Sequence, residues 1–345
     1  MSVSNSTMLH MSSSPHIRHE GTTQSIMADV LIALLPAYLM GVYAFGYRAL
    51  LVMLVTVAAC VLTELIYQKI MKLPLTVGDL SAIVTGAIIT VNMPASIPLW
   101  MPALGGVFAI LVVKQLFGGL GHNIMNPALA ARCFLLISFA AAMTTFPETF
   151  RTLFDGAGVS AVADGGVALD AVSTATPLAA LKAGGEVNIF QMIFNTHNGC
   201  IGEAYPPAIF LGAVYLLVRR VIHIRIPGIY ILSTVGFICL LQVISGNTAL
   251  LTPGYLVAQV CSGGLLLGAV FMATDYVTSP ITPAGQVIFA LLLGLLTAMF
   301  RILGGSAEGV SYAIVIGNLL VPLIEKVTVP RPFGVTRKSK KAKKA

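Results

Sequence analysis

The sequence predicts an all-α integral membrane protein with about ten transmembrane helices. Of its 345 residues, 57% are hydrophobic and 10% are charged, whereas soluble domains average roughly 45–50% and about 25%. The mean hydropathy is +0.91, and several apolar stretches reach the roughly 20 residues that a helix needs to cross a bilayer. This composition excludes a soluble globular fold of this length.

Ten apolar segments between polar breaks correspond to these helices. They are residues 26–46, 49–67, 79–94, 97–115 and 125–145 in the first half, and 206–222, 226–245, 254–274, 284–300 and 309–326 in the second. Segment 79–94 is short and ends in VNMPASIP, which favours a broken helix. The predicted organisation is an N-terminal segment (1–25), a first transmembrane repeat (26–145), a long loop (146–205), a second repeat (206–326) and a basic tail (327–345).

Basic residues predict the orientation, because cytoplasmic flanks of membrane helices are rich in Lys and Arg. With the N-terminus inside, 15 basic residues fall on the cytoplasmic side and 4 on the outer side, while Arg132 lies within a segment. The inner set is Arg18, Lys69, Lys72, Lys114, Arg219, Arg220, Arg225, Lys326, Arg331, Arg337, Lys338, Lys340, Lys341, Lys343 and Lys344, and the outer set is Arg48, Arg151, Lys182 and Arg301. The sequence therefore predicts both termini inside and the long loop, 146–205, outside. No cleavable signal peptide is expected, since the first 25 residues are polar.

The two halves resemble each other weakly. TGAIITVNMPASIP (85–98) and LGAVFMATDYVTSP (267–280) share Gly-Ala at the same offset from a closing proline. Five segments per half then imply two inverted five-helix repeats, an arrangement that commonly builds a site near the membrane midplane. The alternative is that these small residues only let helices pack closely.

Charges in or near the predicted segments are candidates for an ion path, because charge at membrane depth is costly. Asp29 and Glu64 lie in the first half, where both are also compatible with a position at the membrane interface. Asp275 and Glu308 border breaks in the second half, where they either line a cavity or cap helix ends.

Other patterns argue against nucleotide, nucleic-acid and metal sites. GGLGHN (118–123) lacks the phosphate-loop pattern and indicates a tight turn. The tail TRKSKKAKKA suits anionic lipid headgroups better than nucleic acid. The five cysteines form no CxxC pair, and the six histidines show no metal-ligand spacing, so neither an iron–sulfur cluster nor another metal site is expected. Cys200 is expected as a thiol in a polar loop.

The long loop contains the stretch DAVSTATPL, in which small residues surround Thr176. The proline after Thr176 keeps this threonine extended and its hydroxyl accessible. A threonine hydroxyl is a weak nucleophile, so covalent attachment there needs outside activation. From the residues alone, an ordinary surface turn is the simpler interpretation.

The same stretch resembles the flavinylation motif of the Rnf/Nqr membrane electron-transfer complexes, in which the last threonine carries FMN through a phosphoester bond. The matching residues are Asp170, Ser173, Thr174, Ala175 and Thr176, with Thr174 where the family often has glycine. Further segments resemble the family in the same order: SSSPHIR (12–18), KQLFGGLGHNIMNPALAARCFLLISF (114–139), GCIGE (199–203), MATDYVTSPIT (272–282) and GNLLVPLIEK (317–326). Tyr276 stands where the family usually has proline.

The chain is most similar to the family of D subunits of Rnf complexes. The resemblance implies an enzyme subunit, inactive alone, that helps couple electron transfer between ferredoxin and NAD⁺ to Na⁺ or H⁺ translocation. It also implies covalent FMN on Thr176, attached by a flavin transferase, and a second, noncovalent flavin such as riboflavin near the repeat interface. The expected partners are the A, B, C, E and G subunits, which hold the iron–sulfur clusters and the NAD site, in the cytoplasmic membrane of a prokaryotic cell.

Three alternatives remain open from the sequence. One is the related B subunit of the sodium-pumping NADH:quinone reductase. Another is a non-redox channel or transporter of small solutes with the same inverted-repeat plan. The third is a structural scaffold for redox partners, for which Thr176 is replaceable.

Overall fold

The computed structural model describes residues 22–146, 199–246, 251–304 and 309–330, and every regular element within these ranges is a helix. The first half contains α1 (Thr23–Phe45), α2 (Tyr47–Ile70), η1 (Val77–Asp79), α3 (Ser81–Val91), α4 (Trp100–Phe108), η2 (Ala109–Gln115), α5 (Pro127–Ser138) and α6 (Ala140–Thr144). The second half contains α10 (Pro206–Val218), α11 (Arg225–Ile244), α12 (Pro253–Cys261), α13 (Leu265–Leu267), η4 (Gly268–Met272), α14 (Pro283–Ile302) and α15 (Val310–Thr328). The all-α prediction is confirmed for the described residues, and each predicted apolar segment coincides with a helix or a run of consecutive helices.

Four helices begin at a side-chain N-cap, which accounts for their starting points. An oxygen of the cap residue accepts a backbone N–H of the first turn, and this satisfies a donor that has no partner within the helix. The four caps are Thr22 before α1, Asn126 before α5, Thr252 before α12 and Thr282 before α14. In the last three, a proline occupies the first helical position, where its missing N–H costs nothing.

Within the described residues, five helices are long and apolar enough to cross a membrane. They are α1, α2, α11, α14 and α15. A sixth span results if Pro253–Cys261 and Leu265–Met272, which meet at an angle of 55°, count together. Shorter apolar helices are Ser81–Val91, Trp100–Gln115, Pro127–Ser138 and Pro206–Val218. The chain is therefore a multi-pass membrane protein, while ten full spans, the inverted repeats and the orientation stay predictions.

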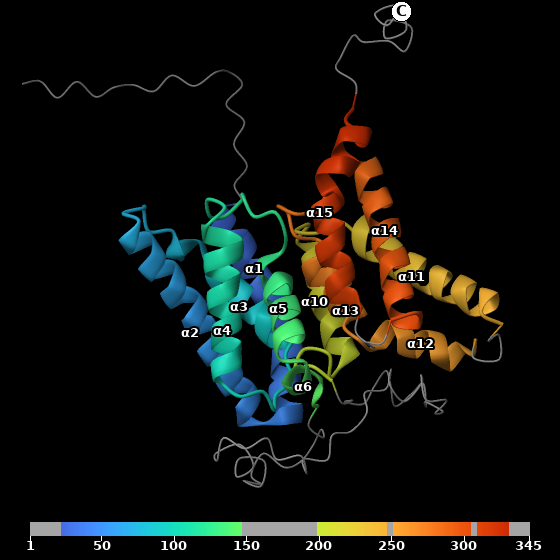
Figure 1. Cartoon of the computed structure of the whole chain (residues 1–345), viewed down its shortest axis with the longest axis horizontal. Coiled ribbons are helices and arrows are strands. Elements are labelled where there is room, and N and C mark those ends of the chain that lie inside the picture. Colours follow the sequence, from blue (N-terminus) through green and yellow to red (C-terminus); the bar gives the residue numbers. More distant parts are fainter. Residues whose placement is uncertain (1–21, 147–198, 247–250, 305–308, 331–345) are drawn as a thin grey trace, which may run out of the picture.

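The helices form two groups that meet along the middle of the molecule (Figure 1). Helices α1 to α6 lie in one group, and α11, α12, α14 and α15 lie in the other. Helix α10 packs against α1, and α15 packs against α5, so both contacts join the halves. The start of α1 and the end of α15 lie at the same end of the molecule, and α6 lies at the opposite end (Figure 1).

Helix α3 ends at Val91, close to the break indicated by VNMPASIP. The backbone N–H groups of Gly202 and Ile201 donate to the carbonyls of Val91 and Met93 at 2.8 and 3.0 Å. The short segment that follows residue 198 is thus fixed against the broken end of α3, deep between the two halves.

Candidate functional site

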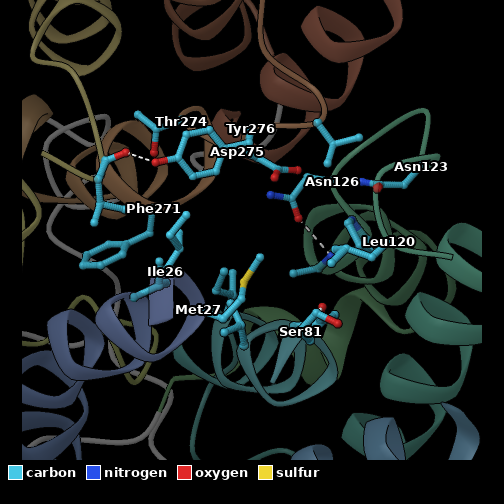
Figure 2. Close-up of a pocket in the computed structure, with 18 of the residues that line it drawn as sticks. Ile26, Met27, Ser81, Leu120, Asn123, Asn126, Phe271, Thr274, Asp275 and Tyr276 are labelled. Carbon is cyan, nitrogen blue, oxygen red and sulfur yellow. Dashed lines mark hydrogen bonds between the residues drawn. The ribbon is translucent and has the colours of Figure 1, made fainter. Parts of the chain in front are cut away.

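A pocket of about 120 Å³ lies where the two halves meet (Figure 2). Its walls come from α1, α3, η2, α5, α10, η4 and the residues after η4. Figure 2 shows Ile26 and Phe271 on one side of the pocket and Asn123 and Asn126 on the other. The polar lining residues are Ser81, Thr85, Lys114, Asn123, Asn126, Thr274, Asp275 and Tyr276. An apolar surface with a few convergent polar groups is the usual composition of a small-molecule site.

Asn126 fixes the polar wall by joining two helices. Its Oδ1 accepts the backbone N–H groups of Ala128 and Leu129 at 3.0 and 3.4 Å, which caps α5. Its Nδ2 donates to the carbonyl of Met272, the last residue of η4, at 3.4 Å. Because α5 belongs to the first half and η4 to the second, Asn126 connects the two halves at the pocket.

The loop after η4 forms the rim of the pocket and contains Asp275, one of the predicted ion-path residues. Thr278 Oγ1 donates to Asp275 Oδ2 at 3.1 Å. Burial raises the pKa of Asp275 above the usual carboxyl value, although hydrogen bonds from Thr278 and from the backbone of Val277 oppose this shift. The hydroxyl of Tyr276 donates to the carbonyl of Val221, so the residue that replaces the usual proline ties this loop to the connection between α10 and α11.

Glu64 is fully buried on α2 and forms an ion pair with Lys114. The ammonium of Lys114 lies 2.9 and 3.0 Å from the two carboxylate oxygens and also donates to Ser81 Oγ at 2.6 Å. The side-chain amides of Gln115 and Gln68 donate to Glu64 Oε1 at 2.9 and 3.2 Å. A buried carboxylate is tolerated because a buried cation and hydrogen-bond donors compensate it.

Lys114 was missed as a site residue by sequence reasoning. Its place at the end of an apolar run predicted a basic residue on the cytoplasmic flank, yet it is only 2% exposed. Lys114 and Gln115 lie in the π-helical stretch η2, and both reach the same carboxylate. Such stretches occur frequently at functional sites. A lysine directly after an apolar run was the available signal, but it is equally typical of an exposed flank.

Asp29 lies on α1 but is not part of the pocket wall. The hydroxyl of Tyr215 donates to Asp29 Oδ1 at 2.8 Å, and Arg219 Nη2 lies 3.3 Å from Oδ2. The Arg219 side chain is 55% exposed, and exposed ion pairs contribute little to stability. Asp29 therefore contributes to the contact between α1 and α10, and its predicted place in an ion path stays a prediction.

Arg132 connects three segments deep between the halves, outside the pocket wall. Its Nη1 donates to Asn92 Oδ1 at 2.9 Å and to Ser311 Oγ at 3.0 Å, and its Nη2 donates to Cys200 Sγ at 3.4 Å. Cys200 lies outside the helices, as expected for a loop residue, but it is buried, with 1% of its surface exposed. The local composition is polar, but the backbone pairing of Ile201 and Gly202 with α3 buries the segment.

Several predicted site residues lie outside the described residues. The motif residues Asp170, Ser173, Thr174, Ala175 and Thr176 fall in 147–198, and Glu308 falls in 305–308. Their roles stay predictions. Among the residues that the structure describes, no three His, Cys, Asp or Glu side chains come together as a metal site.

Apolar helices of membrane-spanning length define a multi-pass membrane protein, and the pocket between its two halves is its candidate binding site. Residues 10–334 match the NQR2, RnfD, RnfE family. The chain belongs to this family.

Three relatives match over nearly the whole chain. The D subunit of the Na⁺-translocating ferredoxin:NAD⁺ oxidoreductase complex of Acetobacterium woodii is 44% identical over 97% of this chain and 98% of the relative. The D subunit of the proton-translocating ferredoxin:NAD⁺ oxidoreductase complex of Clostridium ljungdahlii is 40% identical over 95% and 96%. The D subunit of the ion-translocating oxidoreductase complex of Actinobacillus succinogenes is 34% identical over 95% and 98%.

Proposed function

We propose that this chain is the flavin-carrying membrane subunit of an Rnf-type complex, which couples electron transfer between ferredoxin and NAD⁺ to the transport of Na⁺ or H⁺. The end-to-end similarity to D subunits of such complexes, at 44% and 40% identity, carries this proposal. The relatives from all three organisms are D subunits, which favours this function over that of a quinone reductase B subunit. The chain acts within an enzyme and is not active alone.

Thr176 carries FMN as a phosphoester in this proposal. The support is the sequence pattern of Asp170, Ser173, Thr174, Ala175 and Thr176 within a chain that belongs to the family. A flavin transferase attaches the group, because a threonine hydroxyl needs outside activation. The flavin supplies one-electron chemistry that no side chain provides, and covalent attachment prevents its loss.

The proposed topology has ten spans in two inverted repeats, with both termini on the cytoplasmic side. The agreement between the predicted apolar segments and the helices supports it. Helix α1 starts and α15 ends at the same end of the molecule, and α6 lies at the opposite end (Figure 1). This arrangement also supports the proposed topology. The FMN-bearing loop then lies outside the cytoplasm.

A second, noncovalent flavin such as riboflavin occupies the pocket in this proposal. The lining supports this proposal, because apolar side chains such as Ile26 and Phe271 lie opposite the amides of Asn123 and Asn126 and would contact one edge of the ring (Figure 2). Its volume of about 120 Å³ is below the roughly 300–1,000 Å³ of sites that enclose a whole ligand. The pocket residues would hold and orient the ring edge, and the bound ring would supply electron-transfer chemistry.

The proposed partners are the A, B, C, E and G subunits of the complex, with the iron–sulfur clusters and the NAD site on those subunits. The cytoplasmic membrane is the proposed location. The basic tail after residue 326 then contacts anionic lipid headgroups, at about 1 kcal/mol per basic residue near the surface.

A deletion experiment tests the function. Membranes from cells that lack only this chain should lose ferredoxin-dependent reduction of NAD⁺ and the ion gradient that accompanies it. Expression of the chain from a plasmid should restore both activities. If both activities persist without the chain, the proposed function is wrong.

Acid extraction tests the second flavin, because acid releases noncovalent flavin and leaves covalent flavin on the protein. Met27 lines the pocket, and Met27→Trp should fill the space and abolish the extractable flavin without loss of the covalent flavin. Met299, an exposed residue on α14, provides the control Met299→Trp. If Met27→Trp leaves extractable flavin unchanged, the flavin does not bind in this pocket.

A further inference from the structure

The buried pair of Glu64 and Lys114 has the pocket on one side. Lys114 and Ser81 both line the pocket, whereas Glu64 does not. The ammonium of Lys114 donates to Ser81 Oγ at 2.6 Å and to both oxygens of Glu64. An ammonium has three N–H donors. In Lys114, these hydrogen bonds hold the ammonium between the carboxylate of Glu64 and the pocket wall.

On its other side, the pair is connected to an exposed residue. Thr76 is exposed, and its hydroxyl donates to Glu64 Oε1 at 3.4 Å. The side-chain amide of Gln68 donates to Thr76 Oγ1 at 2.7 Å and to Glu64 Oε1 at 3.2 Å. Hydrogen bonds therefore lead from the protein surface to a carboxylate that is itself 0% exposed.

The surroundings of Glu64 suit a proton better than a metal cation. The donors around its carboxylate are the nitrogens of Lys114, Gln115 and Gln68, and Thr76 contributes one hydroxyl. Sodium and other hard cations require several oxygen ligands. A proton requires only a free lone pair on the carboxylate.

We propose that Lys114 couples the charge in the pocket to the protonation of Glu64. This inference rests on the proposed flavin in the pocket. A negative charge that arrives in the pocket attracts the ammonium of Lys114. The ion pair between Lys114 and Glu64 becomes weaker as a result. As Lys114 withdraws from Glu64 Oε1, the hydroxyl of Thr76 passes its proton to that oxygen and takes a replacement proton from water. Lys114 is a positioning residue in this coupling, since it acts through Glu64.

The charges balance at each step. A flavin in the pocket that holds one additional electron from the low-potential donor of the complex would carry one more negative charge, and one proton from the aqueous phase would form an O–H bond on Glu64. The net charge of the pocket and the ion pair is unchanged. When that electron leaves the pocket for the next carrier, the O–H bond on Glu64 would break and the proton would return to water.

Other titratable groups lie around the pair, and their protonation must be distinguished from that of Glu64. Asp79 accepts the hydroxyl of Ser81 at 2.6 Å, and Cys60 on α2 interacts electrostatically with both members of the pair. Asp275 and Tyr276 line the same pocket. Single substitutions of Glu64 and of Asp275 show which of the two carboxyl groups takes up the proton.

Infrared difference spectroscopy on the whole purified complex, reduced with dithionite, tests this coupling. Reduction of the wild type should produce a band of a protonated carboxyl group that shifts in D₂O. The band should be absent in Glu64→Gln. It should also be absent in Lys114→Met, because no ammonium then connects the charge in the pocket to Glu64. Lys69→Met, which changes an exposed lysine on α2, should retain the band. Asp275 lines the pocket, so Asp275→Asn should retain the band relative to the amount of extractable flavin that it binds.

The coupling is refuted if the band persists in Glu64→Gln or disappears in Lys69→Met. If the wild type releases noncovalent flavin but shows no band, the coupling is wrong while the second flavin stands. If the wild type releases no noncovalent flavin, both are wrong. Should Lys114→Met fail to assemble, the double variant Glu64→Gln/Lys114→Met keeps the site neutral and must also lack the band.

Discussion

The ammonium of Lys114 lies 2.9 and 3.0 Å from the two oxygens of Glu64, and the side chains are 3% and 0% exposed. The two charges come from α2 and η2, fifty positions apart in the chain. Each charge alone would be costly within a membrane protein, and together they are neutral. The pair therefore explains how the first half of the chain accommodates a carboxylate in its interior.

Removal of one member of this pair should destabilise the protein far more than removal of both. We expect Lys114→Met to lower the free energy of unfolding by about 3–5 kcal/mol, because it leaves a buried carboxylate without its cation. The double variant Glu64→Gln/Lys114→Met should recover most of the loss. Thermal unfolding in detergent measures both, and equal destabilisation of single and double variants would contradict the account.

Asn126 should be needed both as a helix cap and as the link between α5 and η4. Asn126→Ala loses the acceptor for Ala128 and Leu129 and the donor to Met272, and a lost cap costs about 0.5–2 kcal/mol. Asn126→Asp keeps the cap acceptor, but it loses the donor and places a carboxylate oxygen against the carbonyl of Met272. We expect both variants to hold less noncovalent flavin and to melt at a lower temperature than the wild type. Normal flavin content in both variants would show that Asn126 does not shape the pocket.

Asp275 should make the pocket loop more stable at low pH. Its pKa is raised in the folded protein because burial disfavours the charged form. The resulting stability is complete below the unfolded pKa of about 3.9 and is lost as the pH rises through the folded value. Asp275→Asn should therefore melt at a higher temperature than the wild type at neutral pH. This difference should vanish in acid, and a difference independent of pH would contradict the assignment.

Gly212 should be required for the contact between α10 and α1. A methyl group there would collide with the carbonyl of Ala33 and lie 3.0 Å from the ring of Phe271. Among the described residues, no atom lies within 4 Å of the corresponding position at Gly236 on α11. We expect Gly212→Ala to destabilise by about 1–3 kcal/mol and Gly236→Ala to be neutral or mildly stabilising. Thermal unfolding of the two variants side by side measures the contrast, and equal effects would argue against this helix contact.

The helices were predictable from sequence because an apolar run indicates a buried helix, whether lipid or protein surrounds it. The break after α3 was also readable, since VNMPASIP contains two prolines that cannot continue a helix. Hydropathy does not distinguish the helices of spanning length from short ones such as α3 and α10, because both are strongly apolar.

Contacts between distant residues were not predictable in the same way. Glu64 was predicted as a charge within an apolar segment, either in an ion path or at the membrane interface. Its partner Lys114 was predicted on the cytoplasmic flank, and only the packing of η2 against α2 brings the two together. Cys200 is buried because its neighbours pair with α3, which local polarity does not indicate. The pocket was expected only as a site at the repeat interface, since its wall combines residues from 26 to 277.

Covalent flavin on Thr176 is the central claim, and in-gel flavin fluorescence after denaturing electrophoresis tests it most directly. The chain should be expressed with a flavin transferase that is active on another substrate, as wild type, as Thr176→Ala and as the neighbouring control Thr174→Ala. We predict a fluorescent band for the wild type and for Thr174→Ala and none for Thr176→Ala. A dark wild-type band, or a fluorescent Thr176→Ala band, would contradict the account, and a dark wild type would favour the channel or scaffold.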